Sequence, residues 1–170
     1  MTDIFSELQS TLTPFADHAI ATAMTPVFFV SSLLFYLLVS KRLFAVIRDK
    51  TGLQKDSTLL KLFVFVHNLS LAIFSLVVFV NVAPHMVAFT STEGWQALHC
   101  DPTFWHSSFG WWCKVFYVSK YWEFIDSWIL ILKGKEASFL QVYHHTGIVI
   151  AMYFGTMYSS NWQIWLVMFK

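Results

Sequence analysis

The chain alternates long apolar runs with short polar segments, and this alternation predicts its architecture. Five such runs are visible, at residues 20–40, 62–82, 109–132, 139–158 and 162–170. A helix needs about 20 apolar residues to cross the hydrocarbon core of a bilayer. The pattern therefore predicts an all-α, multi-pass membrane protein with four complete membrane helices and the start of a fifth.

The polar segments between the runs predict where helices end. The segment 41–61 is charged, with Gly52 as a turn signal, and Pro84 is expected to end the second helix. Residues 83–108 are predicted to form a polar, turn-prone loop. The short connection 133–136 makes the third and fourth helices antiparallel neighbours. We see no internal repeat, so residues 1–170 are interpreted as one membrane domain preceded by a polar N-terminal segment, 1–19.

Composition excludes a soluble globular domain. Charged residues make up 12% of the chain and hydrophobic residues 56%, whereas soluble domains carry about 25% charged residues. The remaining polar surface is too small to face water on all sides. A net charge of +1 gives no indication of nucleic-acid binding.

The distribution of basic residues predicts the orientation in the membrane. The two short loops after the first and third runs carry eight of them, Lys41, Arg42, Arg48, Lys50, Lys55, Lys61, Lys133 and Lys135. The segments 1–19 and 83–108 carry none. Because loops rich in Lys and Arg stay on the cytoplasmic side, we expect the N-terminus and 83–108 to be lumenal.

The third run contains charges that a membrane helix normally avoids. Four polar residues, Lys120, Glu123, Asp126 and Ser127, fall within an arc of roughly 120° on one helix face. Each buried charge costs at least about 2.5–3.5 kcal/mol near the membrane centre. Pairing of Lys120 with Glu123 at i, i+3 would reduce this cost. The charges therefore indicate a functional site, with a structural ion pair as the alternative.

The fourth run repeats the pattern with Gln141, His144 and His145 at i, i+3 and i+4, predicted to share one face. Imidazole can act as nucleophile, general base or metal ligand. His67, beside Asn68, lies at a comparable depth, and its functional and structural interpretations stay open. Cys100 and Cys113 do not form a CxxC pair, and we predict no metal site.

These residues resemble the motifs of long-chain fatty acid elongases. Lys120-Tyr-Trp-Glu123-Phe-Ile-Asp126-Ser127 is similar to the pattern K-x-x-E-x-x-D-T, with Ser in place of Thr. Gln141-Val-Tyr-His144-His145 is similar to the histidine box H-x-x-H-H, in the variant with Gln first. The resemblance covers most of residues 20–170. It implies a seven-helix protein of the endoplasmic reticulum membrane, with six helices around a narrow acyl tunnel.

The resemblance also implies a reaction and roles. A long-chain acyl-CoA would condense with malonyl-CoA to 3-ketoacyl-CoA, CO2 and CoA, without a cofactor or metal. His144 would take the acyl chain, His145, Glu123 and Asp126 would position imidazoles and manage protons, and Lys120 would neutralise the carboxylates. The supporting residues would be Gln141, Ser127, His67 and Asn68. Lys133 and Lys135 would suit CoA phosphates. The implied partners are the bilayer and the ketoacyl reductase, dehydratase and enoyl reductase of the elongation cycle.

The family's third motif, N-x-x-x-H-x-x-M-Y-x-Y-Y, and a later Gln-containing motif are not found. The fifth run rises only about 13 Å as a helix, so we expect a C-terminally truncated member whose 170 residues alone do not condense. Three rivals stay open: a non-catalytic elongase fragment, a transporter with an intramembrane charged site, and a di-iron desaturase. The last needs clustered histidine boxes, whereas five of the seven histidines here are scattered. Chain length, unsaturation, oligomeric state and the origin of the stop are not determined by the sequence.

Overall fold

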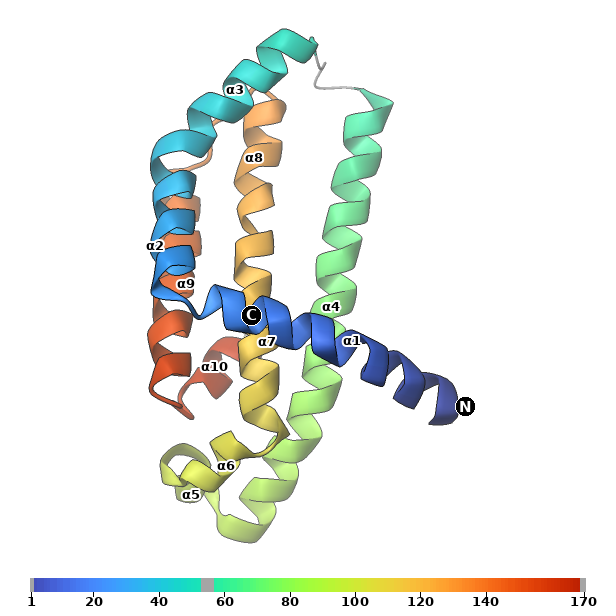
Figure 1. Cartoon of the computed structure of the whole chain (residues 1–170), viewed down its shortest axis with the longest axis vertical. Coiled ribbons are helices and arrows are strands. Elements are labelled where there is room, and N and C mark those ends of the chain that lie inside the picture. Colours follow the sequence, from blue (N-terminus) through green and yellow to red (C-terminus); the bar gives the residue numbers. More distant parts are fainter. Residues whose placement is uncertain (1, 53–56, 169–170) are drawn as a thin grey trace.

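The computed structural model describes residues 2–52 and 57–168, and every element in this part of the chain is helical (Figure 1). In chain order the elements are α1 (Thr2–Ala23), α2 (Pro26–Leu34), the π-helical turn η1 (Phe35–Val39), α3 (Ser40–Thr51), α4 (Thr58–Glu93), α5 (Trp95–Cys100), α6 (Pro102–His106), α7 (Ser108–Trp122), α8 (Phe124–Leu132), α9 (Phe139–Met157) and α10 (Gln163–Met168). The all-α prediction is confirmed for these residues.

The first long helix is made of α2, η1 and α3 and runs over Pro26–Thr51. The prediction of a helix over 20–40 was wrong at both ends. Thr25 begins the helix, since its hydroxyl oxygen accepts a hydrogen bond from the Phe28 N–H and Pro26 follows it at the first helical position. The charged residues after Ser40 continue the helix because they are good helix formers whose chains reach water. Gly52, with φ +61°, ends it as predicted.

Helix α4 runs from Thr58 through Pro84 to Glu93, so the prediction that Pro84 ends the second helix was wrong. Proline removes one backbone hydrogen bond and clashes with the carbonyl four residues earlier, which can bend a helix without ending it. Beyond it, packing keeps the chain helical: the rings of Phe89 and Phe104 lie 4.9 Å apart. The rest of the predicted 83–108 loop is also mostly helical, since α5 and α6 occupy it.

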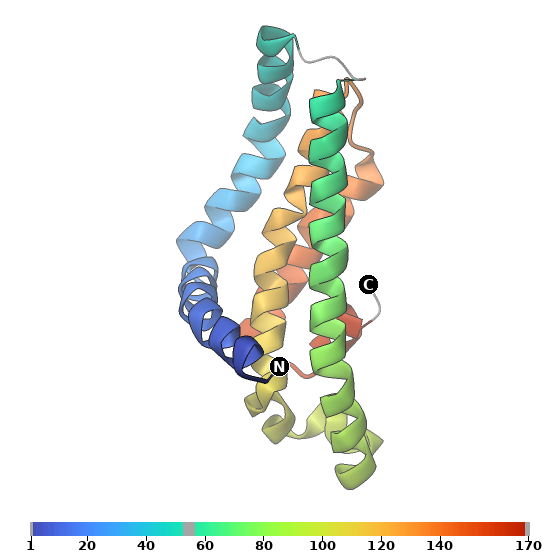
Figure 2. The same cartoon turned by 90° about the vertical axis from the view of Figure 1, so that its right-hand side faces the viewer.

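Helices α7 and α8 form one rod that is interrupted at Glu123, and α9 returns antiparallel beside it, as predicted (Figure 1). The turn between them contains Gly134 at φ +70°. Figure 2 shows α4, the α7–α8 rod and α9 running side by side, with α2–α3 on one side of this row. Helix α1 lies across the long helices and contacts α7.

Stacked aromatic rings fill the contacts between these helices. Phe29 of α2 stacks on Tyr153 of α9 with ring centroids 3.9 Å apart, and Tyr36 of η1 stacks on Phe124 of α8 at 4.1 Å. The outward face of α4 instead exposes large apolar side chains, such as Leu59 and Phe65. Within the described residues, two segments are long and apolar enough to cross a membrane, Pro26–Thr51 and Thr58–Glu93. The two further complete spans stay a prediction.

The two basic segments meet at one end of the molecule. The C-terminal end of α3 and the α8–α9 turn both lie toward the top of Figure 1, whereas α5 and α6 lie at the bottom. Lys41 Nζ is 2.9 Å from Glu136 Oε1, and Arg48 Nη1 donates to the Ile131 carbonyl at 3.4 Å. This grouping is what the predicted orientation requires, and the orientation itself stays a prediction; Lys55 lies outside the described residues.

Candidate functional site

A cluster of ionisable side chains joins three helices in the interior. We call it the polar cluster: Lys120, Glu123 and Asp126 of the α7–α8 rod, His67 of α4 and His145 of α9. Four of its members are buried, and Asp126 is partly buried. Its side chains come from positions 67 to 145, so only the packing of the helices brings them together.

Lys120 and Glu123 form the ion pair that the sequence predicts. Lys120 Nζ lies 2.8 Å from Glu123 Oε1, and the Lys120 residue is 0% exposed. The ammonium also lies 3.5 Å from the centroid of the Phe116 ring. A buried ammonium is costly unless it is paired, and a carboxylate and an aromatic face both attract it. The interruption between α7 and α8 falls at Glu123, the residue whose carboxylate pairs with Lys120.

His145 lies between the two carboxylates. Its Nδ1 is 3.9 Å from Glu123 Oε2, and its Nε2 is 4.0 Å from Asp126 Oδ2. These separations exceed hydrogen-bond length, so each carboxylate is a close neighbour of the ring rather than a direct hydrogen-bond partner. The arrangement places one imidazole within proton-exchange range of two carboxylates.

Asp126 also holds His67. Its Oδ1 lies 2.8 Å from His67 Nε2, so a neutral His67 donates from Nε2 and carries its lone pair on Nδ1. The Nδ1 atom is buried and has no hydrogen-bond partner among the described residues. The His67 ring packs 6.2 Å from the ring of Trp122. His67 therefore directly contacts the cluster's carboxylate, and its role stays a prediction.

Sequence reasoning missed Tyr36. Its hydroxyl forms a hydrogen bond of 2.8 Å with Ser127 Oγ, and its ring lies 6.4 Å from that of His145. The π-helical turn begins one residue earlier, and Ser40 Oγ donates to the Tyr36 carbonyl at 2.6 Å. A tyrosine in the middle of an apolar run was the available signal, because a buried hydroxyl needs a partner.

Some predicted site residues lie outside the cluster. Gln141 is half-buried, whereas Asn68 and His144 are exposed. Adjacent helical residues point about 100° apart, so the rotation that turns His145 toward α7 turns His144 away from it. The two imidazoles are nevertheless close, with ring centroids 5.7 Å apart. His144 thus presents a nucleophilic ring on the exposed face of α9, next to a buried imidazole.

The arrangement suits acid–base and nucleophilic chemistry. Two carboxylates, two imidazoles and an ammonium follow one another from His67 to Lys120 and can share protons. Within residues 2–52 and 57–168, no group of three or more His, Cys, Asp or Glu side chains is arranged to hold a metal ion.

Comparison with known proteins relates this cluster to a family. The model of the ELO family, described as GNS1/SUR4, matches residues 21–170. Among curated proteins, a fatty acid elongase of Dictyostelium discoideum is 33% identical over 72% of this chain and 45% of its own length. Fatty acid elongase 2 of Trypanosoma cruzi is 34% identical over 61% of this chain and 38% of its own length. Fatty acid elongase 2 of Trypanosoma brucei brucei is 35% identical over 56% and 36%, respectively.

No solved structure matches the chain. The chain spans less than half the length of these curated relatives. The family match nevertheless covers nearly all of it, including both motifs that carried the resemblance and every member of the polar cluster. This chain therefore belongs to the ELO (GNS1/SUR4) family of fatty acid elongases.

Proposed function

We propose that this chain forms part of a 3-ketoacyl-CoA synthase that condenses a long-chain acyl-CoA with malonyl-CoA. The observation that carries the proposal is the polar cluster, in which His145 lies 3.9 and 4.0 Å from two carboxylates inside an apolar helical protein. Such groups are expensive to bury and are retained where they perform chemistry. Membership of a family of membrane-embedded elongation enzymes supports this interpretation.

His144 is the proposed acyl acceptor. An imidazole nitrogen attacks the thioester carbonyl, the C–S bond breaks, and CoA leaves with the proton that the imidazole gives up. Malonyl-CoA then loses CO2, and the resulting α-carbanion attacks the acyl-imidazole carbon. The C–N bond breaks, and a proton from solvent restores the neutral imidazole. The exposure of His144 supports this role, because an acyl acceptor must be reachable by its substrate.

The polar cluster is proposed to relay this proton from solvent to the His144 imidazole. His145 is next to His144 and lies between Glu123 and Asp126, so a proton can pass between these carboxylates and His144 through the His145 ring. Lys120 compensates the charge of Glu123, and His67 fixes the Asp126 carboxylate. Ser127 and Tyr36 hold the start of α8 against the first long helix. Gln141 and Asn68 are assigned supporting roles through the family motifs alone.

We further propose a multi-pass topology in the endoplasmic reticulum membrane. The α7–α8 rod and α9 would be the third and fourth spans, and the family's seven helices would complete the tunnel. The basic end would face the cytoplasm, where Lys133 and Lys135 can bind CoA phosphates. The reductases and dehydratase of the elongation cycle would then act on the product.

A condensation assay in microsomes, to which radiolabelled malonyl-CoA is added, tests the proposal. Residues 1–170 would be assayed alone and joined at Lys170 to the C-terminal part of the Dictyostelium relative, in a yeast strain without its own elongases. We expect product only from the joined protein, because four helices and α10 leave the site open to lipid.

In the joined protein, His144→Ala should abolish condensation, and Asp126→Asn should lower it by at least about a hundredfold. His85→Ala, an exposed histidine on α4, is the matched control and should retain activity. Substantial product from the His144 variant would remove it from the nucleophile role. Proton flux without any condensation would favour the transporter alternative.

A further inference from the structure

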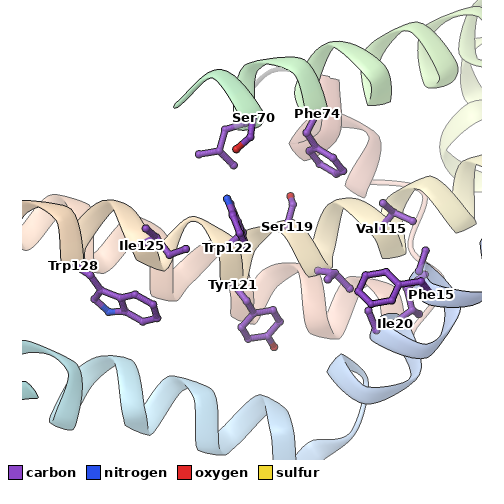
Figure 3. A pocket seen from close by; sticks show the side chains of 14 residues that line it. Phe15, Ile20, Ser70, Phe74, Val115, Ser119, Tyr121, Trp122, Ile125 and Trp128 are labelled. Carbon is purple, nitrogen blue, oxygen red and sulfur yellow. The ribbon is translucent and has the colours of Figure 1, made fainter. Parts of the chain in front are cut away.

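A large cavity lies on the face of the α7–α8 rod that is turned away from α9. Its volume is about 670 Å³, and α1, α4 and the rod contribute its walls. Figure 3 shows side chains from the three helices around this space. Neither His144 nor any member of the polar cluster lines it, so the cavity is separate from the proposed catalytic site.

Helix rotation explains the separation. Val115, Val118 and Trp122 recur at spacings of three and four residues and face the cavity. Lys120 and Phe124 lie on the other side of the rod, where Phe124 contacts His145 of α9. The rod therefore presents one face to the polar cluster and another to the cavity.

The chemistry of the lining limits what can occupy the cavity. No charged residue lines it. Its hydroxyls already have partners within the protein: Ser70 Oγ donates to the His67 carbonyl at 2.7 Å, Ser119 Oγ to the Phe116 carbonyl at 2.7 Å, and Tyr121 bonds to Tyr117. Water would gain few hydrogen bonds there. The cavity opens at the molecular surface, since Phe15 and Trp122 in its lining are 76% and 53% exposed. An acyl chain can therefore enter it from the bilayer, whereas an ionic headgroup inside would lose its hydration.

From these observations we propose that the cavity binds one acyl chain of a bilayer phospholipid, with the headgroup outside. A volume of about 670 Å³ lies within the range of sites for single small ligands. Trp128, whose buried Nε1–H has no hydrogen-bond partner among the described residues, and Trp122 supply aromatic surface for the chain. The site does not depend on the proposed condensation.

The bound acyl chain would contact two residues that adjoin His67 of the polar cluster. Trp122 lines the cavity, and its ring lies 6.2 Å from that of His67. Ser70 also lines the cavity and bonds to the His67 backbone. An acyl chain in contact with both residues would restrict the motion of the His67 ring, which hydrogen-bonds to Asp126.

Photo-crosslinking of the 170-residue chain in phosphatidylcholine nanodiscs tests this site. A fraction of the phosphatidylcholine carries a diazirine in its acyl chain, and adducts are mapped by mass spectrometry. We expect adducts concentrated on cavity-lining residues of α1, α4 and α7. Adducts spread evenly over the exposed apolar face of α4 would overturn the proposal, because that is the pattern of lipid that merely surrounds the protein.

Two cavity-filling variants from opposite walls sharpen the test. Ala19→Phe on α1 and Ser70→Phe on α4 should each reduce the cavity adducts on the order of tenfold, the factor for loss of about two buried methylene groups. Ala21→Phe and Ser75→Phe, which place the same ring at exposed positions outside the cavity, are the matched controls and should leave the adducts unchanged. Circular dichroism and elution volume check that each variant folds.

Competition with unlabelled lipids identifies whether the bound acyl chain comes from a phospholipid or from acyl-CoA. A tenfold excess of unlabelled phosphatidylcholine should dilute the adducts in proportion, whereas long-chain acyl-CoA at micromolar concentration should not change them. Displacement by acyl-CoA would overturn the assignment, since the cavity would then belong to the substrate. Adducts that persist in both cavity-filling variants would also contradict it.

Discussion

At the scale of single residues, burial decides which polar groups need partners. Tyr36 lies in an apolar run, yet its hydroxyl is buried and hydrogen-bonds to Ser127 Oγ at 2.8 Å. A buried hydroxyl left unpaired costs about 1–3 kcal/mol. This bond, which joins residues 91 positions apart, therefore stabilises the contact between η1 and α8.

Tyr36→Phe should destabilise the folded chain by about 1 kcal/mol, because Ser127 loses its partner while the ring keeps its stacking on Phe124. Thermal unfolding in detergent, followed by circular dichroism, measures the change. Tyr158→Phe, at an exposed tyrosine, is the control and should be neutral. Equal stability of the two variants would show that the hydrogen bond contributes nothing.

Asp101 gives a pH-dependent prediction outside the membrane-spanning helices. The hydroxyl and the backbone N–H of Thr103 both donate to its carboxylate at the start of α6, and they hold the pKa of Asp101 below its ordinary value. A carboxyl with a lowered folded-state pKa contributes stability above its unfolded pKa, and this is lost as the pH falls through the folded pKa.

Thr103→Val should therefore raise the pKa of Asp101 toward its ordinary value, since the hydroxyl donor is removed and the N–H remains. The chemical shift of the Asp101 carboxyl carbon, followed by NMR in a pH titration, measures this pKa directly. An unchanged or lower pKa would contradict the assignment of Thr103 as the cause. Thr92→Val, an exposed threonine on α4 whose hydroxyl bonds only to its own helix, serves as the control.

At the scale of elements, the apolar runs predicted which helices exist better than where they end. The fourth run was predicted over 139–158 and α9 covers Phe139–Met157, because local hydrophobicity and the capping Ser138 agree there. Across Pro84, by contrast, contacts with other helices keep the chain helical, whereas after Ser40 charged residues with good helix propensity continue the helix. The predicted boundaries were therefore wrong where tertiary packing outweighed a local signal and where the end of an apolar run was taken as the end of a helix.

The junction of α9 and α10 depends on Gly155. An added Cβ there would lie 2.2 Å from Gln163 Nε2, and the Gln163 side chain is buried, with hydrogen bonds to Thr156 and to the Met152 carbonyl. Gly155→Ala should displace Gln163 and destabilise the chain by about 1–3 kcal/mol. Thermal unfolding measures the loss.

Gly147→Ala is the control within the same helix. Apart from its chain neighbours and the nearby backbone of the same helix, no atom lies within 4 Å of a Cβ added there, and alanine is the better helix former by up to about 1 kcal/mol. We therefore expect unchanged or slightly higher stability. Similar losses in both variants would show that general helix perturbation, rather than displacement of Gln163, is the cause.

At the scale of the whole molecule, the two ends differ in charge. The α3 end and the α8–α9 turn carry the basic residues, and Lys41 and Arg48 tie these two segments together. Among the described residues of α5 and α6 there is no Lys or Arg. This asymmetry supports the proposal that the basic end is cytoplasmic.

Labelling with a membrane-impermeant maleimide in sealed microsomes tests the orientation. Lys50→Cys in a Cys100→Ser background should react from outside, and the natural Cys100, exposed on α5, should react only after permeabilisation. Cys113, which is buried, should stay unlabelled in the folded protein and serves as the control. Reaction of Cys100 in intact vesicles would reverse the proposed topology.

The sequence by itself determined the helical class, the pairing of Lys120 with Glu123, and the membership of the elongase family, which the family match shows. These features are local, since hydrophobicity and spacings of three or four residues follow from one helix alone. Only the tertiary structure decided that His145 rather than His144 faces the carboxylates, and that His67 reaches Asp126 across 59 residues. Which side chains face the carboxylates depends on how each helix is rotated about its axis. That rotation is set by the packing of aromatic side chains from distant parts of the chain.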